Sequence, residues 1–178
     1  MRPGVTIFLL AILGAILAGP GVASAQARMV TGTPEVIDGR TLMIKGRRFR
    51  LFGIDVPGHG QVCERFGRAY PCGLVARTAL MDLVAGASVT CRSVTSEQAK
   101  RVKLAGAKDE KGGMIALCQA TSVDLSWNMV HTGWALAEPN YGSRYYGAIE
   151  SAARKRGSGL WKGKFTKPWI WRQENLKK

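Results

Sequence analysis

The first third of the mature chain alternates short apolar runs with turns that contain glycine and charged residues. Such a pattern is typical of β-strands joined by hairpins. We expect three strands, over 29–37, 41–44 and 47–54, divided by turns at Asp38-Gly39 and Lys45-Gly46. Because the two turns follow each other so closely, the segment is predicted to form an antiparallel meander.

The remaining chain combines two more strand-like runs with helical periodicity. Strands are expected over 89–94 and 114–119, and helices over 73–83, 123–131 and 143–155. Asp124 is a suitable cap for the second helix, and Gly133 is suited to end it. The polar stretch from Thr95 to Gly113 is predicted to be a mobile surface loop. The predicted fold class is therefore α+β with a mainly β core: a five-stranded OB-type barrel with about three helices packed against it.

The first 25 residues have the features of a secretory signal peptide. Arg2 is followed by an apolar run, and Ala23-Ser24-Ala25 is a small-residue cleavage site, with a second site after Ala27. The alternative is an uncleaved anchor, but the run is short for a span of about 20 residues. We expect residues 1–25 to be removed, 26–165 to form the domain and 166–178 to form a basic and aromatic tail, so that the protein is periplasmic or secreted.

The net positive charge of the chain indicates which classes of ligand it attracts. The whole chain has 26 Lys and Arg against 12 Asp and Glu, and loss of Arg2 with the signal peptide leaves 25 against 12, a net charge of +13. A surface of this kind attracts nucleic acid, acidic polysaccharide or anionic lipid. The alternative is a basic surface that keeps the protein in solution and has no specific partner. We expect a monomer.

Four cysteines in an exported chain predict two disulfides. Four cysteines allow three connectivities. Cys63 and Cys72 flank a short loop, whereas Cys91 and Cys118 each lie within a strand-like run, and we therefore pair Cys63 with Cys72 and Cys91 with Cys118. A zinc site is the rival interpretation, but the chain has no C-x-x-C spacing and its two histidines form no ligand pattern.

Four segments, in order, resemble motifs of the thermonuclease family, the staphylococcal-nuclease-like domains. They are Val36–Thr41 (VIDGRT, like VIDGDT), Phe49–Gly58 (FRLFGIDVPG, like FRLxGIDxPE), Met129–Ala135 (MVHTGWA, like LVxxGxA) and Tyr146–Trp161, which is similar to the closing helix of the family. The cysteines and the PWIWR segment resemble the exported bacterial branch. The resemblance implies an OB barrel and Ca²⁺-dependent cleavage of DNA and RNA.

The catalytic groups that the family would place in this chain are mostly replaced. Such cleavage needs oxygen ligands for the metal, a group that activates water, and cationic donors for the phosphate. By the motifs, one metal-binding aspartate is retained as Asp55, with Val56 in place of the usual Thr, and one arginine is retained as Arg50. The other aspartate is Arg40, the glutamate is Gly58, and the second arginine corresponds to Gly113.

These replacements predict that ordinary thermonuclease activity is absent. A guanidinium about 5 Å from a dication is repelled by roughly 6–7 kcal/mol at an effective dielectric near 20, so Arg40 opposes Ca²⁺ binding. We expect no cofactor, or Ca²⁺ only if relocated groups restore cleavage. Arg40 and Arg50 are predicted to hold a phosphate without cutting it. The alternative for the retained pair is a structural ion pair between Arg50 and Asp55.

Three further side chains are candidates for relocated groups. His59 follows Gly58 and is a candidate displaced base, although an exposed loop histidine is more often a bystander. Lys111 or Arg101 would replace the missing arginine if the long loop folded over the pocket. An active nuclease built on such groups is one alternative function, and an envelope protein-interaction module is another.

The tryptophans of the chain have two interpretations. In the C-terminal tail, basic residues interleave with Trp161, Phe165, Trp169 and Trp171, a combination that suits single-stranded nucleic acid. We favour the alternative, in which these aromatic rings pack the tail on the barrel. Trp127 and Trp134 are predicted to lie in the core.

Overall fold

The computed structural model describes residues 28–102, 104 and 108–175. The predicted signal peptide, residues 1–25, lies outside the described residues. Among the helices of the described part, none has the length and apolar character needed to cross a membrane.

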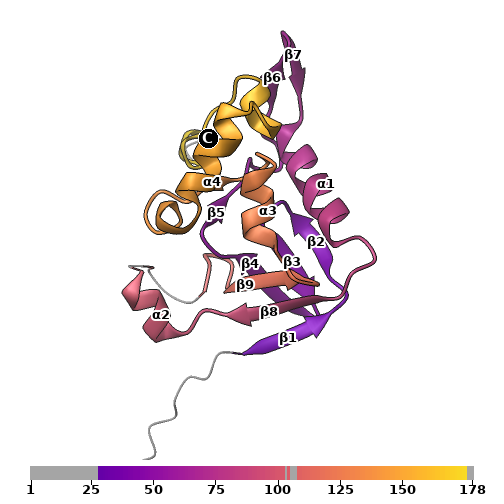
Figure 1. Cartoon of the computed structure of the whole chain (residues 1–178), viewed down its shortest axis with the longest axis vertical. Coiled ribbons are helices and arrows are strands. Elements are labelled where there is room, and N and C mark those ends of the chain that lie inside the picture. Colours follow the sequence, from indigo (N-terminus) through magenta and orange to yellow (C-terminus); the bar gives the residue numbers. More distant parts are fainter. Residues whose placement is uncertain (1–27, 103, 105–107, 176–178) are drawn as a thin grey trace, which may run out of the picture.

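A curled sheet forms the body of the molecule, and helices pack against it (Figure 1). Its strands are β1 (Met29–Gly32), β2 (Glu35–Asp38), β3 (Thr41–Ile44), β4 (Arg47–Leu51), β8 (Val89–Ser93), β9 (Met114–Ala120) and β10 (Val123–Asp124). The order is β1-β8-β9-β4-β3-β2, with β10 beside β9. β4 and β9 run parallel, whereas the other neighbours in this sheet are antiparallel. The α+β class and the OB-type plan are confirmed.

The predicted first strand is in fact two strands. β1 and β2 are separated at Thr33 and Pro34, and they pair with different partners, β8 and β3. Proline has no N–H to give to a strand ladder, which explains why one continuous strand over 29–37 was the wrong prediction. This division and the short β10 give the sheet seven strands rather than five.

The helices are more numerous than predicted. They are α1 (Cys72–Val84), α2 (Ser96–Arg101), α3 (Leu125–His131), α4 (Ser143–Lys155) and α5 (Pro168–Asn175), with the 3₁₀ helix η1 (Gly159–Lys162). The three predicted helices correspond to α1, α3 and α4, and Asp124 caps α3 by accepting from the Trp127 N–H. Helix α2 corrects the prediction that residues 95–113 form only a loop. Thr95 begins α2 with a capping box that includes Gln98.

The core lies between the sheet and helices α1, α3 and α4. On β4, Phe49 and Leu51 are fully buried. Helix α1 presents residues at four-residue spacing, Ala76, Leu80 and Val84, to the same core. A disulfide joins Cys91 of β8 to Cys118 directly opposite on β9, which confirms that predicted pair.

Two short pairs of strands extend this body. β5 (Ile54–Asp55) pairs with β11 (Leu136–Ala137), and β6 (Cys63–Arg65) pairs with β7 (Arg68–Tyr70). The β6–β7 hairpin projects at the end of the molecule opposite β1 (Figure 1). The second predicted disulfide, Cys63–Cys72, is also present and joins this hairpin to the start of α1.

The aromatic residues near the C-terminus pack mainly as expected. Trp161, Phe165 and Trp169 pack against a small second core cluster, so they hold this segment on the domain. Trp134 is half-buried and contacts both clusters. The prediction for Trp127 was wrong, because its side chain is 39% exposed and stacks on His131 with ring centroids 4.5 Å apart.

Candidate functional site

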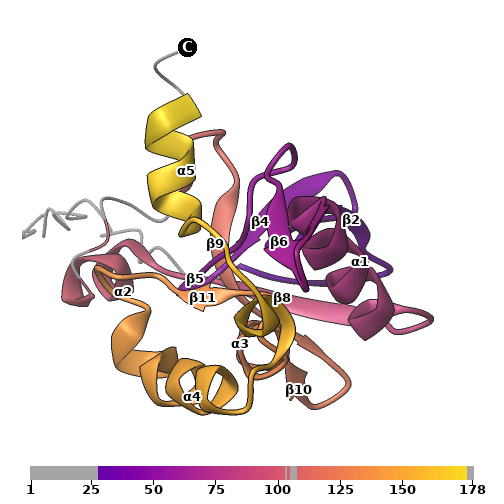
Figure 2. The same ribbon diagram turned by 90° about the horizontal axis from the view of Figure 1, so that it is seen from above.

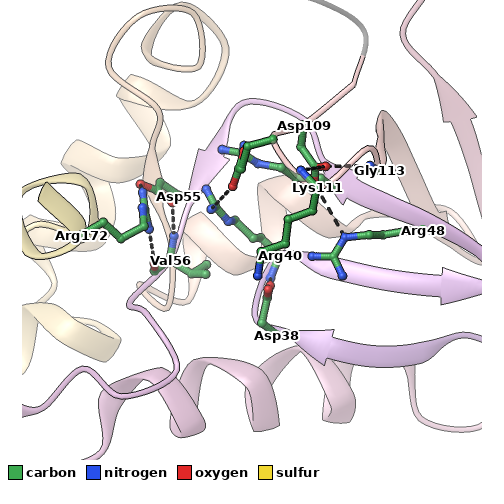
Figure 3. A network of polar contacts seen from close by, with 11 residues as sticks. Asp38, Arg40, Arg48, Asp55, Val56, Asp109, Lys111, Gly113 and Arg172 are labelled. Atoms are coloured by element: carbon green, nitrogen blue, oxygen red, sulfur yellow. Dashed lines mark hydrogen bonds and ion pairs between the residues drawn. The ribbon is translucent and has the colours of Figure 1, made fainter. Parts of the chain in front are cut away.

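The residues that the motifs assigned to metal and phosphate meet at one edge of the sheet (Figure 3). Arg40 lies in the turn between β2 and β3, where its N–H donates to Asp38 Oδ1 at 2.9 Å. The β3–β4 register sets Thr41 opposite Arg50, so the two arginines are neighbours. Asp55 is held alongside by the pairing of β5 with β11.

Both carboxylate oxygens of Asp55 are occupied by cationic side chains. Arg40 pairs with Oδ1 and Arg172 pairs with Oδ2. The Val56 N–H also donates to Oδ1, at 3.0 Å. Asp55 is 2% exposed and Arg40 is 8% exposed. The retained family carboxylate therefore serves as the centre of a buried ion-pair network.

Arg50 has a different partner from the one that we considered. The prediction of a structural Arg50–Asp55 pair was wrong, because Asp55 is paired with Arg40 and Arg172. Arg50 Nη1 instead donates to Glu110 Oε2 at 3.2 Å, and Arg40 Nη2 lies 3.8 Å from Glu110 Oε1. The Glu110 side chain is 63% exposed, so this carboxylate lies over the two guanidinium groups from the solvent side.

The charges of this cluster shift two pKa values. Burial lowers the pKa of Arg40, and the nearby Arg50 and Arg172 lower it further, against the opposing effect of Asp55. Arginine nevertheless stays protonated in proteins. Burial alone would raise the pKa of Glu110, but a backbone hydrogen bond and the arginines outweigh it and hold this pKa below its ordinary value. Arg40 and Glu110 therefore both carry their charge near neutral pH.

Helix α5 covers the position where the family has its glutamate. Figure 2 shows α5 rising beside β5, on the side away from α4. A Cβ atom built on Gly58 would lie 2.3 Å from Cζ3 of Trp171. Gln61 Nε2 donates to the Thr166 carbonyl at 2.6 Å, which ties the segment before α5 to the same loop. The indole ring of Trp171 thus occupies the space that any side chain at position 58 would need.

The position predicted for the second arginine is a buried glycine. The Gly113 N–H donates to Asp109 Oδ1 at 2.6 Å, and a Cβ there would lie 2.9 Å from Cγ of Arg48. Arg48 Nε lies 3.8 Å from Asp109 Oδ2. Residues 109–113 therefore form a tight turn fastened to β4, and this turn brings the carboxylate of Glu110 to the pocket instead of a cation.

The candidates for relocated groups do not join the cluster. His59 is exposed. Arg101 pairs with Glu97 on the outside of α2, at 3.3 Å, and lines a separate hollow beside Phe52. The Lys111 N–H donates to Asp109 Oδ1, and its side chain is exposed.

The residues present do not fit the calcium ion of the family. Calcium takes six to eight oxygen ligands, usually with more than one carboxylate. Within residues 28–102, 104 and 108–175, no group of three or more His, Cys, Asp or Glu side chains is arranged to hold a metal. The Asp55 carboxylate pairs with the guanidinium groups of Arg40 and Arg172. The Glu110 carboxylate pairs with Arg50 and with the second Nη of Arg40.

Reading the sequence missed two members of this site. Arg172 is 117 residues from Asp55, and Glu110 is 60 residues from Arg50. Arg172 belongs to the PWIWR segment, whose mixed basic and aromatic character marked it as unusual. Nothing in the local sequence, however, indicated that this segment folds back as a helix onto the pocket.

The fold and the position of Arg50 and Asp55 define a domain of the thermonuclease class, as the motifs predicted. The model of the staphylococcal nuclease homologue family matches residues 48–163, and the chain belongs to this family. The succinoglycan biosynthesis protein ExoI of Rhizobium meliloti (strain 1021) is 27% identical to it over 154 residues, which are 85% of this chain and 74% of that protein.

Proposed function

We propose that this protein is an exported, nuclease-fold binding domain that holds nucleic acid or another polyanion and does not cleave it. The observation that carries the proposal is the double pairing of Asp55 with Arg40 and Arg172. A calcium ion at Asp55 would have to displace both guanidinium groups and then tolerate Arg40 nearby. Because like charges repel strongly in a partly buried site, this exchange is unfavourable.

The absence of a water-activating group supports the same conclusion. Gly58 supplies no base, and Trp171 fills the adjacent space. Loss of a general base typically lowers a rate by about 10²–10⁴, and loss of a charged donor to the transition state by about 10²–10³. Although these factors need not multiply, either one alone reduces cleavage to a small fraction of that of an intact site.

The basic surface supports binding. With the signal peptide removed the net charge is +13, from 25 basic and 12 acidic residues. Such a charge raises association rates with polyanions and makes their binding sensitive to salt. Two disulfides and the N-terminal sequence support an exported location.

Phosphate binding by Arg40 and Arg50 is a further part of the proposal. Glu110 lies against both guanidinium groups, so its carboxylate takes the place that a phosphate would take. Because the Glu110 side chain is largely exposed, it can move into solvent when a phosphate enters. The pocket would then exchange one anion for another, with no metal involved.

A polysaccharide is the second candidate polyanion. The rhizobial relative is named for succinoglycan biosynthesis, which favours including an acidic polysaccharide among the ligands tested. The shared requirement is an anionic chain that the basic surface attracts.

The test is a combined binding and cleavage assay of purified protein from residue 26 onward. Labelled DNA and RNA, single- and double-stranded, are incubated with Ca²⁺ or with a chelator, and both complex formation and fragment length are followed. We expect binding that weakens steeply with salt and fragments of unchanged length. Calcium-dependent cleavage that is lost in Asp55→Asn would contradict the proposal.

A further inference from the structure

A second basic region lies away from the Asp55 network, around the β6–β7 hairpin. Two surface hollows, of about 740 and about 540 Å³, meet at Arg65 and Trp134, which line both. One continues along the hairpin past Arg68 and Tyr70, and the other continues toward Arg156 and Lys162. We call this continuous surface the hairpin groove.

The hairpin groove carries positive charge without compensation. Four basic side chains line it: Arg65, Arg68, Arg156 and Lys162. Among the described residues that line it, none is acidic. Arg65, at the junction of the two hollows, has no acidic partner among these lining residues. Glu64, the neighbouring acid, lies on the other face of β6 and pairs with Lys164 at 3.7 Å.

The tip of the hairpin carries an aromatic ring in an unfavourable place. Phe66 is 82% exposed and has a φ of 51°, followed by Gly67 with a φ of 72°. Hairpin turns with two positive φ values favour Asn, Asp and Gly, and a bulky residue at positive φ is an outlier. Strained or exposed apolar residues of this kind concentrate at binding sites. Phe66 therefore presents an exposed ring at the hairpin tip, on a backbone conformation that bulky residues rarely adopt.

The hairpin is fastened so that this ring is presented on a rigid support. The Cys63–Cys72 disulfide anchors its base, and reciprocal backbone hydrogen bonds of 2.9 Å join Glu64 to Lys164. The Arg65 guanidinium lies over the Phe66 ring, 5.1 Å from its centroid, which helps to orient the ring. A pre-ordered ring and cation lose little freedom when a ligand binds.

We propose that the hairpin groove binds single-stranded nucleic acid, with phosphates along its four cations and a base stacked on Phe66. This inference rests on the proposed polyanion-binding function and gives it a location. Single strands expose the faces of their bases, and aromatic rings beside cations are the usual means of holding them. In a double helix the base faces are already stacked on one another, so the Phe66 ring cannot stack on them.

The test measures binding of fluorescent oligonucleotides of about 12 nucleotides in chelator, so that cleavage plays no part. The variants are Phe66→Ala, Phe66→Tyr and the double variant Arg65→Ala/Arg68→Ala. Arg47→Ala, at an exposed arginine at the start of β4, is the control for removal of one positive charge outside the groove. Because Phe66 is exposed, its replacement leaves the core intact, and circular dichroism verifies the fold of each variant.

We expect Phe66→Ala to weaken single-strand binding about 5- to 160-fold, the range for loss of one stacked base, and to change duplex binding little. Phe66→Tyr should bind like the parent protein, and Arg47→Ala nearly so. Arg65→Ala/Arg68→Ala should lower the salt slope by about 1.4, from about 0.7 per phosphate contact on a single strand.

Three results would overturn the inference. The first is unchanged single-strand binding in both groove variants while the parent protein binds, which would leave the proposed function standing and reject this location. The second is an equal loss in Arg47→Ala, which would indicate diffuse charge. The third is binding of an acidic polysaccharide such as alginate, lost in Phe66→Ala, without binding of oligonucleotides. A parent protein that binds no polyanion would instead reject the proposed function itself.

Discussion

The Asp55 network and the hairpin groove both contain several arginines, but the arginines differ in whether acidic side chains pair with them. In the Asp55 network, Arg40 and Arg172 pair with Asp55, and Arg40 and Arg50 pair with Glu110. In the hairpin groove, the described lining residues include no acid. The same residue type is therefore paired with acidic side chains in one place and has no acidic neighbour among the lining residues in the other.

This difference shows how a family pocket can change its role. Where one metal-binding aspartate of the family corresponds to Arg40, the remaining carboxylate, Asp55, pairs with Arg40 and Arg172 instead. Breaking a buried pair leaves an uncompensated charge, which costs more than the pair contributes. Such a site resists return to metal binding by single substitutions.

The largest expected effect is that of Asp55→Ala. Removal of this carboxylate leaves Arg40 and Arg172 without their shared partner, and we expect the free energy of unfolding to fall by about 3–5 kcal/mol. Chemical denaturation of the variant and the parent measures it. Asp82→Ala removes the same charge from an exposed position on α1 and should change stability by less than about 0.5 kcal/mol. A loss in Asp55→Ala no larger than that of the control would show that the network is not structural.

Removal of each disulfide in turn should show whether oligonucleotide binding depends on the anchored hairpin. Cys91 and Cys118 are 27 residues apart and Cys63 and Cys72 are 9 apart, so loop-closure entropy predicts losses of roughly 3.5 and roughly 2.5 kcal/mol on replacement by serine. We expect only the Cys63→Ser/Cys72→Ser variant to weaken oligonucleotide binding below its unfolding transition, because that bridge anchors the hairpin. Equal binding by both variants would argue against a rigid hairpin groove.

The contact between Gly58 and Trp171 is testable by a double-mutant cycle. Gly58→Ala should destabilise the protein by about 1–3 kcal/mol, because the added methyl group overlaps the indole ring. In a background with Trp171→Ala the same substitution should cost much less, and thermal unfolding of the four proteins gives the coupling energy. Equal costs in both backgrounds would mean that α5 does not cover this position in solution.

The smallest expected effect is that of Glu110→Gln. Because the side chain is largely exposed, its pairing should contribute no more than about 1 kcal/mol to stability. Its pKa is lowered in the folded state, so this contribution is present above the ordinary glutamate pKa and is lost as the pH falls through the lowered value. The Gln variant should lack this pH dependence and should bind a nucleotide bisphosphate more tightly, as calorimetry would show. Weaker binding would contradict phosphate entry beside Arg40 and Arg50.

The sequence predicted what depends on local pattern and missed what depends on distant contact. The strand β4, the Asp124 cap of α3, and both disulfides followed from neighbouring residues and spacing. Trp127 was wrongly predicted to be buried, because on a short helix the pattern does not decide whether one large apolar residue faces the core or the solvent. Arg172 and Glu110 were missed because their partners lie 117 and 60 residues away. The aromatic residues of the tail indicated that it packs on the barrel, but not that Arg172 reaches Asp55.

The central claim is that Asp55 is committed to arginines and cannot serve a metal. Calorimetric titration of the purified protein with Ca²⁺ tests it most directly. We predict no saturable heat at millimolar Ca²⁺ and no change in the thermal midpoint. A stoichiometric binding isotherm that disappears in Asp55→Asn would contradict the account.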